Sequence, residues 1–230
     1  MQVRHPLTLI TKETSPLNLT VENTCLLLQD LHSPFTDDAD GWLVNRVNQK
    51  VLMREFDDYF HLLGLIRPNI PRVLKAAREM GIRVTYSCLG HWANDAPSLF
   101  QKATGWTWNL DDPLGRHPEE WKPKDDEPVF SKPGWGALAN PKFAAYLTKN
   151  NIANVIVMGA LLDFGIRQTC LELSDHGIQS LILGDAAFGL TDAGHIFTSD
   201  AVAHGLVKIR TTGEFLLLLK TMEREGSVLI

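Results

Sequence analysis

The chain has 230 residues, of which 44% are hydrophobic and 21% charged, a composition that excludes a disordered protein and suits one α/β domain over residues 1–230. The formal net charge of −5 excludes a strongly basic surface of the kind that holds a phosphate backbone, so we expect no nucleic acid partner. No apolar run approaches the roughly 20 residues that cross a bilayer, and residues 1–16 lack a signal peptide's apolar segment, so we expect a cytoplasmic protein with no membrane partner.

Short apolar runs along the chain have the composition of buried parallel strands. They are rich in branched side chains and apolar on both faces, which is typical of strands that helices cover on both sides. In chain order the strong ones are residues 24–30, 82–88, 153–159 and 179–185, and the weaker ones are residues 127–131 and 206–210.

Amphipathic patterns between these runs predict helices. In residues 69–81 the apolar side chains recur at positions i, i+3, i+4 and i+7, and Gly81 stands where a glycine commonly ends a helix. Residues 163–177 repeat the pattern, with Gly177 at the end. Further helices are predicted over residues 141–151 and 211–226, and a weaker one over residues 192–205.

Two long stretches show neither pattern and are expected to be irregular. They are residues 31–66 and residues 89–126, and the second carries four of the six tryptophans. Irregular segments of this length inside a compact domain are commonly lids or binding loops. The alternation of strands and helices in the rest of the chain predicts a three-layer α/β/α fold with a mostly parallel, open sheet.

Polar groups follow three of the predicted strands at the point where each strand ends. Asp30 comes directly after the first apolar run, Lys132 ends the short strand before residue 133, and the turn from Gly159 to Gly165 follows the strand over residues 153–159. Ligands in sheets of this class bind outside the carboxyl ends of the strands. We therefore expect these three ends to meet in one cleft.

Three stretches of sequence, by their order and spacing, resemble the isochorismatase-like or cysteine hydrolase superfamily. They are TCLLLQDLHSPF, SKPGWGALANPKF, and VMGALLDFGIRQTCLELSDHG followed by LILGDA. The resemblance implies a three-layer α/β/α hydrolase of small molecules that is commonly a homo-oligomer and uses an Asp, Lys, Cys triad. Its aspartate corresponds to Asp30 and its lysine to Lys132. The triad cysteine would stand six residues after Gly159, where this sequence has Gly165.

Cys170 is five residues beyond the position of the missing thiol. It lies on the apolar face of the helix predicted over residues 163–177, where a cysteine behaves as a small hydrophobic residue. A reactive thiolate would be better placed at the helix N-terminus, where the dipole lowers its pKa. The three cysteines are far apart and form no CxxC or Cys/His pattern, so we expect reduced thiols and no structural zinc. The Asp30-x-His32 pair is similar to one in metal-binding relatives but lacks their further histidine, and we predict no metal and no cofactor.

The glycine at position 165 also indicates which chemistry to expect. The isochorismatases proper, which hydrolyse a vinyl ether, are similar to this sequence in carrying glycine there, whereas the amidases of the superfamily use the thiolate. Cleavage of a vinyl ether needs a proton on carbon and water at the resulting cation, and no covalent nucleophile. The sequence departs from that subgroup at Leu89, where the subgroup typically has glutamine, so both vinyl ether and amide-type bonds stay open.

Asp30 is the candidate general acid or base. Burial at a strand end raises the pKa of a carboxyl group and a neighbouring lysine lowers it, and the sequence leaves the balance open. Lys132 is the candidate electrostatic partner, which holds Asp30 ionised or binds developing negative charge. The turn over residues 161–165 offers backbone N–H groups near a helix N-terminus. The resemblance places a cis peptide in this turn, near Leu161–Leu162.

Further residues are candidates for contact with the substrate. Gly165 leaves room for a substrate or a water molecule, and Leu161 and Leu162 belong to the same turn. His91 is a candidate for substrate contact or metal binding, although a lone histidine in a loop is more often neither. Aromatic side chains near the strand ends either line an apolar pocket or fill the core, and these are Phe35, Trp135 and Phe164.

These observations favour a hydrolase that acts on a small molecule without a cysteine nucleophile, with water attacking directly. A second hypothesis is a non-catalytic member of the same fold that binds a metabolite or a partner in the same cleft. A third is a conventional amidase that uses Cys170, which requires the helix register to be wrong by more than one turn.

Overall fold

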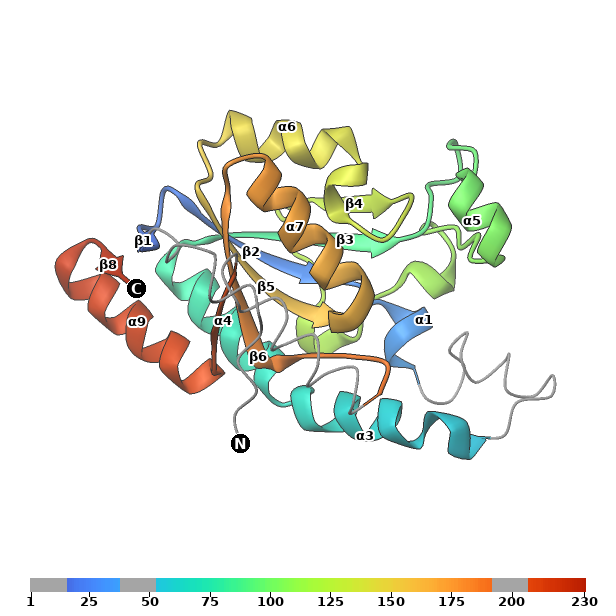
Figure 1. Ribbon diagram of the computed structural model, residues 1–230, viewed down its shortest axis with the longest axis horizontal. Helices are drawn as coiled ribbons and strands as arrows, with labels where there is room; N and C mark the ends of the chain where they lie inside the picture. Colours follow the sequence, from blue (N-terminus) through green and yellow to red (C-terminus); the bar gives the residue numbers. More distant parts are fainter. Residues whose placement is uncertain (1–15, 38–52, 192–206) are drawn as a thin grey trace, which may run out of the picture.

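A six-stranded sheet forms the centre of the computed structural model, which describes residues 16–37, 53–191 and 207–230 (Figure 1). The strand order is β4-β3-β2-β5-β6-β7, and each neighbouring pair is parallel. This confirms the predicted parallel sheet. The strands are β2 (Thr24–Gln29), β3 (Arg83–Leu89), β4 (Val129–Lys132), β5 (Asn154–Ala160), β6 (Gln179–Phe188) and β7 (Val207–Arg210).

The central strands are buried on both faces because their side chains alternate between two apolar layers. In β2, Leu26 and Leu28 belong to one core cluster, while Cys25 and Leu27 belong to the other. Strand β5 divides in the same way. This period of two explains why the central strands read as continuous apolar runs in the sequence.

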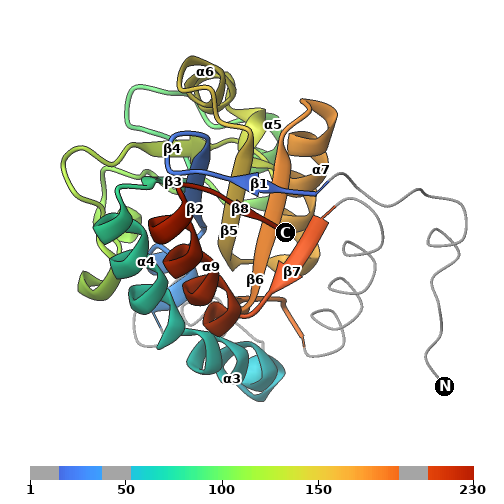
Figure 2. The same cartoon turned by 90° about the vertical axis from the view of Figure 1, so that its left-hand side faces the viewer.

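Helices cover both faces of the sheet and complete the predicted three-layer architecture (Figures 1 and 2). One face carries α3 (Asp57–Ile66), α4 (Asn69–Met80) and α9 (Thr212–Glu225), and the other carries α6 (Pro141–Lys149) and α7 (Arg167–Asp175). Helix α4 ends at Gly81, whose φ of 76° is a left-handed conformation that glycine adopts without a Cβ penalty. Strands β1 (Asn18–Leu19) and β8 (Val228–Leu229) form a separate antiparallel pair.

Helix α3 was not expected, because residues 31–66 were predicted to be irregular. The structure has the short helix α1 (Ser33–Thr36), a three-ten turn over Met53–Phe56 and then α3. The buried residues of α3 fall at i, i+3, i+4 and i+7, so the signal was in the sequence and was overlooked; they are Tyr59, Leu62, Leu63 and Ile66.

The second stretch predicted to be irregular, residues 89–126, contains a short helix and two turns. Helix α5 (Leu99–Thr104) begins with a capping box in which the Ser98 hydroxyl accepts a hydrogen bond from the backbone N–H of Gln101, and the Gln101 side chain accepts one from the N–H of Ser98. Three-ten turns follow at Pro113–Gly115 and Glu119–Trp121. We call residues 89–126 the Trp-rich segment.

Two further expectations differ from the structure by a few residues, and a third lies outside the described part of the chain. Strand β6 was predicted to end at Asp185 but continues to Phe188, because its register with β5 shifts between Val157 and Gly159. The cis peptide lies at Ala160–Leu161, one residue before the place implied by the resemblance. The helix predicted over residues 192–205 lies outside the described residues.

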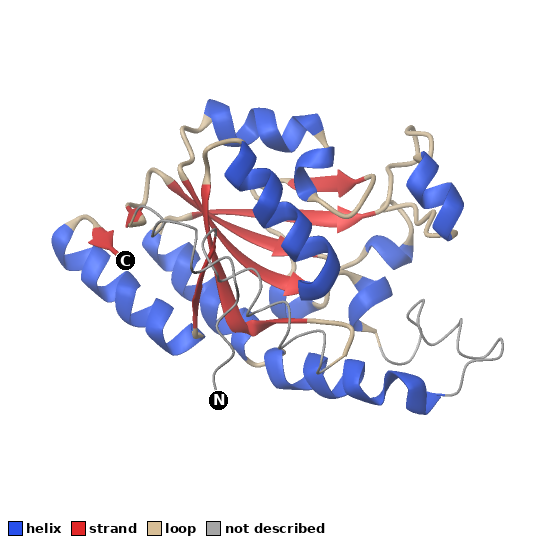
Figure 3. Cartoon of the chain, in the orientation of Figure 1, coloured by secondary structure: helices blue, strands red, loops and turns tan. Residues whose placement is uncertain are grey.

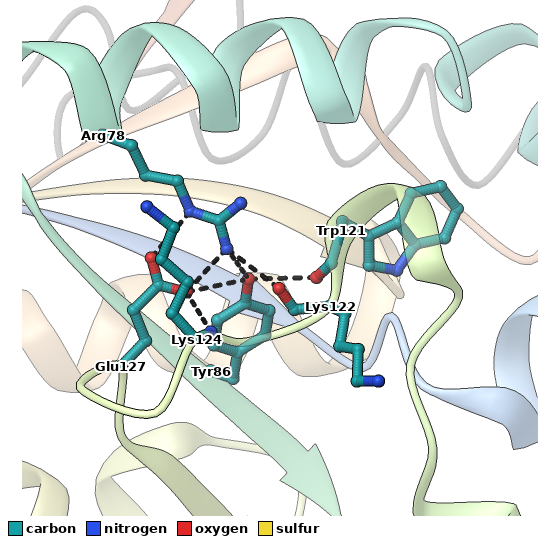
Figure 4. Close-up of polar contacts among 6 residues, drawn as sticks. All are labelled: Arg78, Tyr86, Trp121, Lys122, Lys124 and Glu127. Carbon is teal, nitrogen blue, oxygen red and sulfur yellow. Dashed lines mark hydrogen bonds and ion pairs between the residues drawn. The ribbon is translucent and has the colours of Figure 1, made fainter.

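A partly buried polar network ties the Trp-rich segment to the body of the protein (Figure 4). The Arg78 guanidinium on α4 donates to both carboxylate oxygens of Glu127 at 2.7 Å, and also to the backbone oxygen of Lys122 at 2.9 Å. The hydroxyl of Tyr86 on β3 donates to the backbone oxygen of Trp121 at 3.0 Å. Paired arginine–carboxylate bonds of this kind combine charge with fixed geometry, so the C-terminal part of the segment is held on two elements of the fold.

Within the described residues, no helix has both the length and the apolar character needed to span a membrane. Figure 3 shows that the helices lie around the sheet, with loops gathered at the two ends of the strands.

Replacement of Arg78 by alanine is expected to lower the free energy of unfolding by about 1–3 kcal/mol, because the Glu127 side chain, only 7% exposed, loses its partner. Urea denaturation measures this change. Lys75→Ala removes an exposed i,i+4 pair with Glu79 at 3.8 Å and should change stability by less than about 0.5 kcal/mol. Equal effects of the two substitutions would contradict a structural role for the network.

Candidate functional site

The order of the strands defines the point at which a site is expected. From β2 the chain builds outward through β3 and β4, then returns to the other side of β2 to form β5. The switch point of the sheet therefore lies between the carboxyl ends of β2 and β5, and open α/β sheets bind ligands at such a point. Asp30 follows β2 there, and Leu161 follows β5.

A buried ion pair joins the ends of β2 and β4. The Asp30 carboxylate oxygen Oδ2 lies 2.6 Å from Lys132 Nζ, and the two side chains are 4% and 0% exposed. The other carboxylate oxygen, Oδ1, accepts a hydrogen bond from the backbone N–H of Leu89 at 2.7 Å. Lys132 Nζ also donates to the backbone oxygen of Trp135 at 2.8 Å. The two strand-end charges predicted to meet are therefore in direct contact.

The backbone of Asp30 turns sharply to bring its carboxylate into this position. Its φ is 52°, in the left-handed region that few residues other than glycine adopt, and its N–H donates to the backbone oxygen of Ser87 at 2.9 Å. Such a conformation costs on the order of 1 kcal/mol for an aspartate, and strained residues of this kind cluster at functional sites.

Burial sets the protonation of Asp30. The loss of water around the carboxyl group raises its pKa, and the Lys132 ammonium and the Leu89 N–H offset only part of this rise. The net pKa of Asp30 lies above the ordinary value for aspartate. The effect of burial therefore exceeds the effect of Lys132, and Asp30 holds its proton more readily than an aspartate in water.

Gly165 lies against this pair. A Cβ atom built on Gly165 would come within 3.3 Å of Lys132 Nζ and 3.2 Å of the backbone oxygen of Trp135. It would also lie 2.6 Å from Gln29 Nε2, a distance that real Cβ atoms do not reach. The position at which the family's thiol was expected is therefore beside the ion pair, with no space for a side chain in the present arrangement.

Gln29 is a residue of this site that reasoning from the sequence missed. It is fully buried at the end of β2, and its Oε1 accepts a hydrogen bond from the Thr169 hydroxyl of α7 at 2.7 Å. The sequence showed only a polar residue next to Asp30 in a strand that was otherwise apolar. That polar residue was itself a signal, because a buried amide needs partners.

A row of aromatic rings flanks the site. Trp135 stacks on Phe164 at 4.9 Å, and Trp106 of the Trp-rich segment meets Trp135 edge to face at 5.3 Å. Trp106 stacks on Trp108 at 5.8 Å, and Trp108 contacts Phe35 at 5.4 Å. Phe164 keeps 41% of its surface exposed, while Phe35 is buried in the core. The Trp-rich segment thus supplies part of an apolar wall beside the strand ends.

The other predicted contact residues either turn their side chains into the core or lie in the Trp-rich segment. Leu161 and Leu162 are buried, one in each core cluster, so their side chains pack instead of facing open space. His91 sits in the Trp-rich segment, where its Nδ1 is 3.0 Å from the backbone oxygen of Trp92. His91 also lines a cavity of about 540 Å³ together with Gln101 and Lys142.

A second cavity, of about 550 Å³, lies on the other side, between α1 and the turns of the Trp-rich segment. Its lining includes Ser33, Thr36, Arg116 and His117. Neither cavity is lined by Asp30 or Lys132. The ion pair is therefore closed off from both in this conformation.

Two histidines lie near the site, the buried His32 and the partly buried His117, which lines the second cavity. His32 Nε2 is 3.1 Å from the backbone oxygen of Leu89, and the rings of His32 and His117 are 6.1 Å apart. His117 Nε2 is 3.4 Å from the sulfur of Cys88. Burial lowers the pKa of His117 to about 4, lowers the pKa of His32 well below its usual value and raises that of Cys88. Cys88 and His117 therefore form a neutral pair and not a thiolate–imidazolium pair.

The remaining cysteines are also buried. Cys170 is fully buried in the core cluster on the α7 face of the sheet, and burial raises the pKa of its thiol to about 12. Burial has the same effect on Cys25. Among the described residues, no three side chains of His, Cys, Asp or Glu gather closely enough to hold a metal ion.

Replacement of Lys132 by methionine is expected to lower the stability by several kcal/mol at pH 8, because it leaves a buried carboxylate without a partner. The folded pKa of Asp30 then rises further above its unfolded value. The loss relative to wild type therefore grows as the pH rises and shrinks toward pH 4–5. Urea denaturation across this range tests the sign, and Asp30→Asn combined with Lys132→Met should recover most of the stability at pH 8.

His32 and His117 predict the opposite dependence in the wild-type protein. Since their folded pKa values lie below the unfolded value of about 6.5, the unfolded state binds more protons as the pH falls. Stability should therefore decrease from about pH 6.5 toward pH 4, by roughly 3 kcal/mol for His117 alone. His117→Gln should flatten this part of the stability curve, while the exposed His61→Gln should leave it unchanged.

Comparison with known proteins identifies the family of the chain. An isochorismatase domain model matches residues 24–214. An uncharacterized isochorismatase family protein, YwoC, from Bacillus subtilis (strain 168) is 26% identical over 160 residues, which are 68% of this chain and 85% of that protein.

Solved structures share the fold. A cysteine hydrolase from Pseudomonas syringae pv. phaseolicola 1448A superposes with a TM-score of 0.74 at 15% identity, over 91% of this chain and 98% of that one. The nicotinamidase/pyrazinamidase PncA from Bacillus subtilis has a TM-score of 0.64 at 16% identity, over 81% and 98% of the two chains. The residues that the family model matches make up most of this chain. The chain therefore belongs to the isochorismatase family and is an isochorismatase-like hydrolase.

Proposed function

We propose that the protein hydrolyses a small molecule by direct attack of water, without a covalent intermediate on sulfur. The observation that carries this proposal is the position of Gly165, whose Cβ would lie 3.3 Å from Lys132 Nζ. The acidic side chain Asp30 and the basic side chain Lys132 are both present, and Gly165 beside them has no nucleophilic atom. The burial and raised pKa values of Cys25, Cys88 and Cys170 support the same proposal, since the thiolate is the reactive form.

For a vinyl ether, Asp30 acts first as the acid. Its carboxyl group gives a proton to the terminal carbon of the double bond, and the other carbon becomes an oxocarbenium ion. Water adds to that carbon and returns a proton to the Asp30 carboxylate, and the resulting hemiketal separates into a carbonyl compound and an alcohol. The raised pKa of Asp30 suits this role, because the group must hold a proton before it can donate one. Lys132 stabilises the carboxylate that forms.

For an amide-type bond, Asp30 acts first as the base. It takes a proton from water, which attacks the carbonyl carbon, and then gives that proton to the leaving nitrogen. Lys132 stabilises negative charge on the tetrahedral intermediate. One structurally similar protein is described as a nicotinamidase/pyrazinamidase, which brings aromatic amides into the set of compounds to test. The aromatic wall formed by Trp135, Phe164 and Trp106 favours a planar or apolar body on either kind of substrate.

A second candidate is a binding protein of the same fold. The closure of the site bears on both candidates alike, since Asp30 is 3% exposed, Lys132 is 0% exposed, neither lines a described cavity, and a metabolite needs access to them just as a substrate does. The two candidates differ in turnover alone, which a substrate screen measures.

Small amides, ureides and enol ethers should be screened by mass spectrometry with wild type, Asp30→Asn and Cys170→Ala. We expect turnover in wild type and Cys170→Ala, and a loss of about 100-fold or more in Asp30→Asn, because the proton transfer is removed. Asp125→Asn, at an exposed aspartate, is the matched control and should keep wild-type activity. Intact protein quenched during turnover should show no added mass.

The other results separate the alternatives. Loss of activity in folded Cys170→Ala, or a covalent adduct on the protein, would refute the proposed mechanism. Absence of turnover for every compound would favour the binding protein.

A further inference from the structure

Only one of the two polar atoms in the side-chain amide of Gln29 has a hydrogen-bond partner. Its oxygen Oε1 accepts a hydrogen bond from the Thr169 hydroxyl, but its nitrogen Nε2 is buried without any hydrogen-bond partner. An unpaired buried donor costs roughly 1–3 kcal/mol, and native proteins leave few of them. The Gln29 nitrogen is therefore free to donate to an acceptor that another molecule supplies.

A chain of hydrogen bonds fixes which end of the amide faces the site. The backbone N–H of Ala137 donates to the Thr169 hydroxyl oxygen at 2.9 Å, so the hydroxyl hydrogen is available to donate onward. It donates to Gln29, and the atom that receives it must be the amide oxygen. The nitrogen is therefore turned the other way, toward Gly165.

Two nitrogen donors meet at Gly165. The position of a Cβ on this residue lies 2.6 Å from Gln29 Nε2 and 3.3 Å from Lys132 Nζ. Lys132 donates to Asp30 and to the backbone oxygen of Trp135, which uses two of the three hydrogens of its ammonium group. One N–H of Lys132 Nζ and both N–H groups of Gln29 Nε2 therefore remain to donate to an acceptor.

We propose that Gln29 is a substrate-binding residue, whose Nε2 donates to a carbonyl or carboxylate oxygen of the bound molecule beside Lys132. This deepens the proposed function and rests on it for the identity of the reaction. The two donors select for an oxygen with accessible lone pairs and partial or full negative charge. In the hydrolysis of an amide they hold the oxygen on which charge develops, and in that of a vinyl ether they hold a carbonyl or carboxylate group of the substrate.

Nuclear magnetic resonance tests this assignment without turnover. The side-chain ¹⁵NH₂ signals of Gln29, identified through their loss in Gln29→Met, are followed while acetate and acetamide are added to the wild-type protein. Both probes carry the acceptor oxygen and are small. We expect the Gln29 signals to shift saturably with at least one probe. Gln179, the first residue of β6 and therefore at the opposite end of the sheet from the site, is the internal control, and its signals should move less.

Kinetics with any substrate found in the screen give the second readout. Gln29→Met has a similar length without a donor, so it should fold and should reduce kcat/KM by about tenfold or more. Gln29→Glu keeps the shape but turns the donor into an acceptor, and it should lose at least as much. A role in packing alone predicts that Gln29→Met retains wild-type kinetics. If Gln29→Met does not fold, through-bond assignment in wild type identifies the signals and the titration decides.

The outcomes separate this inference from the proposed hydrolysis. Saturable shifts of Gln29 without turnover of any compound would uphold the binding role and refute the hydrolysis. Turnover with unchanged kinetics in Gln29→Met would refute the role of Gln29 and leave the hydrolysis standing. Gln29 signals that stay fixed with both probes, or that move no more than those of Gln179, would also overturn the assignment.

Discussion

The contact between Asp30 and Lys132 is the constraint on which the arrangement of the site depends. Two opposite charges at 2.6 Å, shielded from water, attract strongly, but their removal from water is costly, so the surroundings must supply further hydrogen bonds. The fold provides them from two elements, the N–H of Leu89 at the end of β3 and the backbone oxygen of Trp135 after β4. The ion pair thus ties together the ends of three adjacent strands.

The same burial gives the pair its chemical character. In water an aspartate beside a lysine is ionised, whereas here the loss of solvent outweighs the lysine and raises the pKa of Asp30. A site that excludes water also strengthens each remaining electrostatic contact. Gln29, Thr169 and Gly165 belong to this buried region, and their packing determines the space beside the ion pair.

Much of the fold could be predicted because the sheet is parallel and covered on both faces. The strong apolar runs are strands in the structure, and Gly81 and Gly177 follow the two helices with the clearest periodicity. Helix α3 has the same helical periodicity, so the sequence does encode it although residues 31–66 were predicted to be irregular. Its buried residues are Tyr59, Leu62, Leu63 and Ile66. The Ser98 and Gln101 capping box was likewise present in the sequence.

The site was predictable only in part. Strand ends identify Asp30 and Lys132, because the carboxyl ends of parallel strands share one edge of the sheet. The direction of the Gln29 amide depends on Thr169, which is 140 positions away, and no local pattern encodes such a contact. The row of rings from Phe35 to Trp135 also arises from packing between distant segments.

The contact of Gln29 with Gly165 also bears on how such a site can change over generations. A side chain introduced at position 165 would displace the end of the Gln29 amide, and a smaller residue introduced at position 29 alone would leave a void beside Gly165. Substitutions at the two positions are therefore expected to have non-additive effects, because each changes the space that the other residue occupies. The consequence of any exchange at position 165 thus depends on which residue stands at position 29.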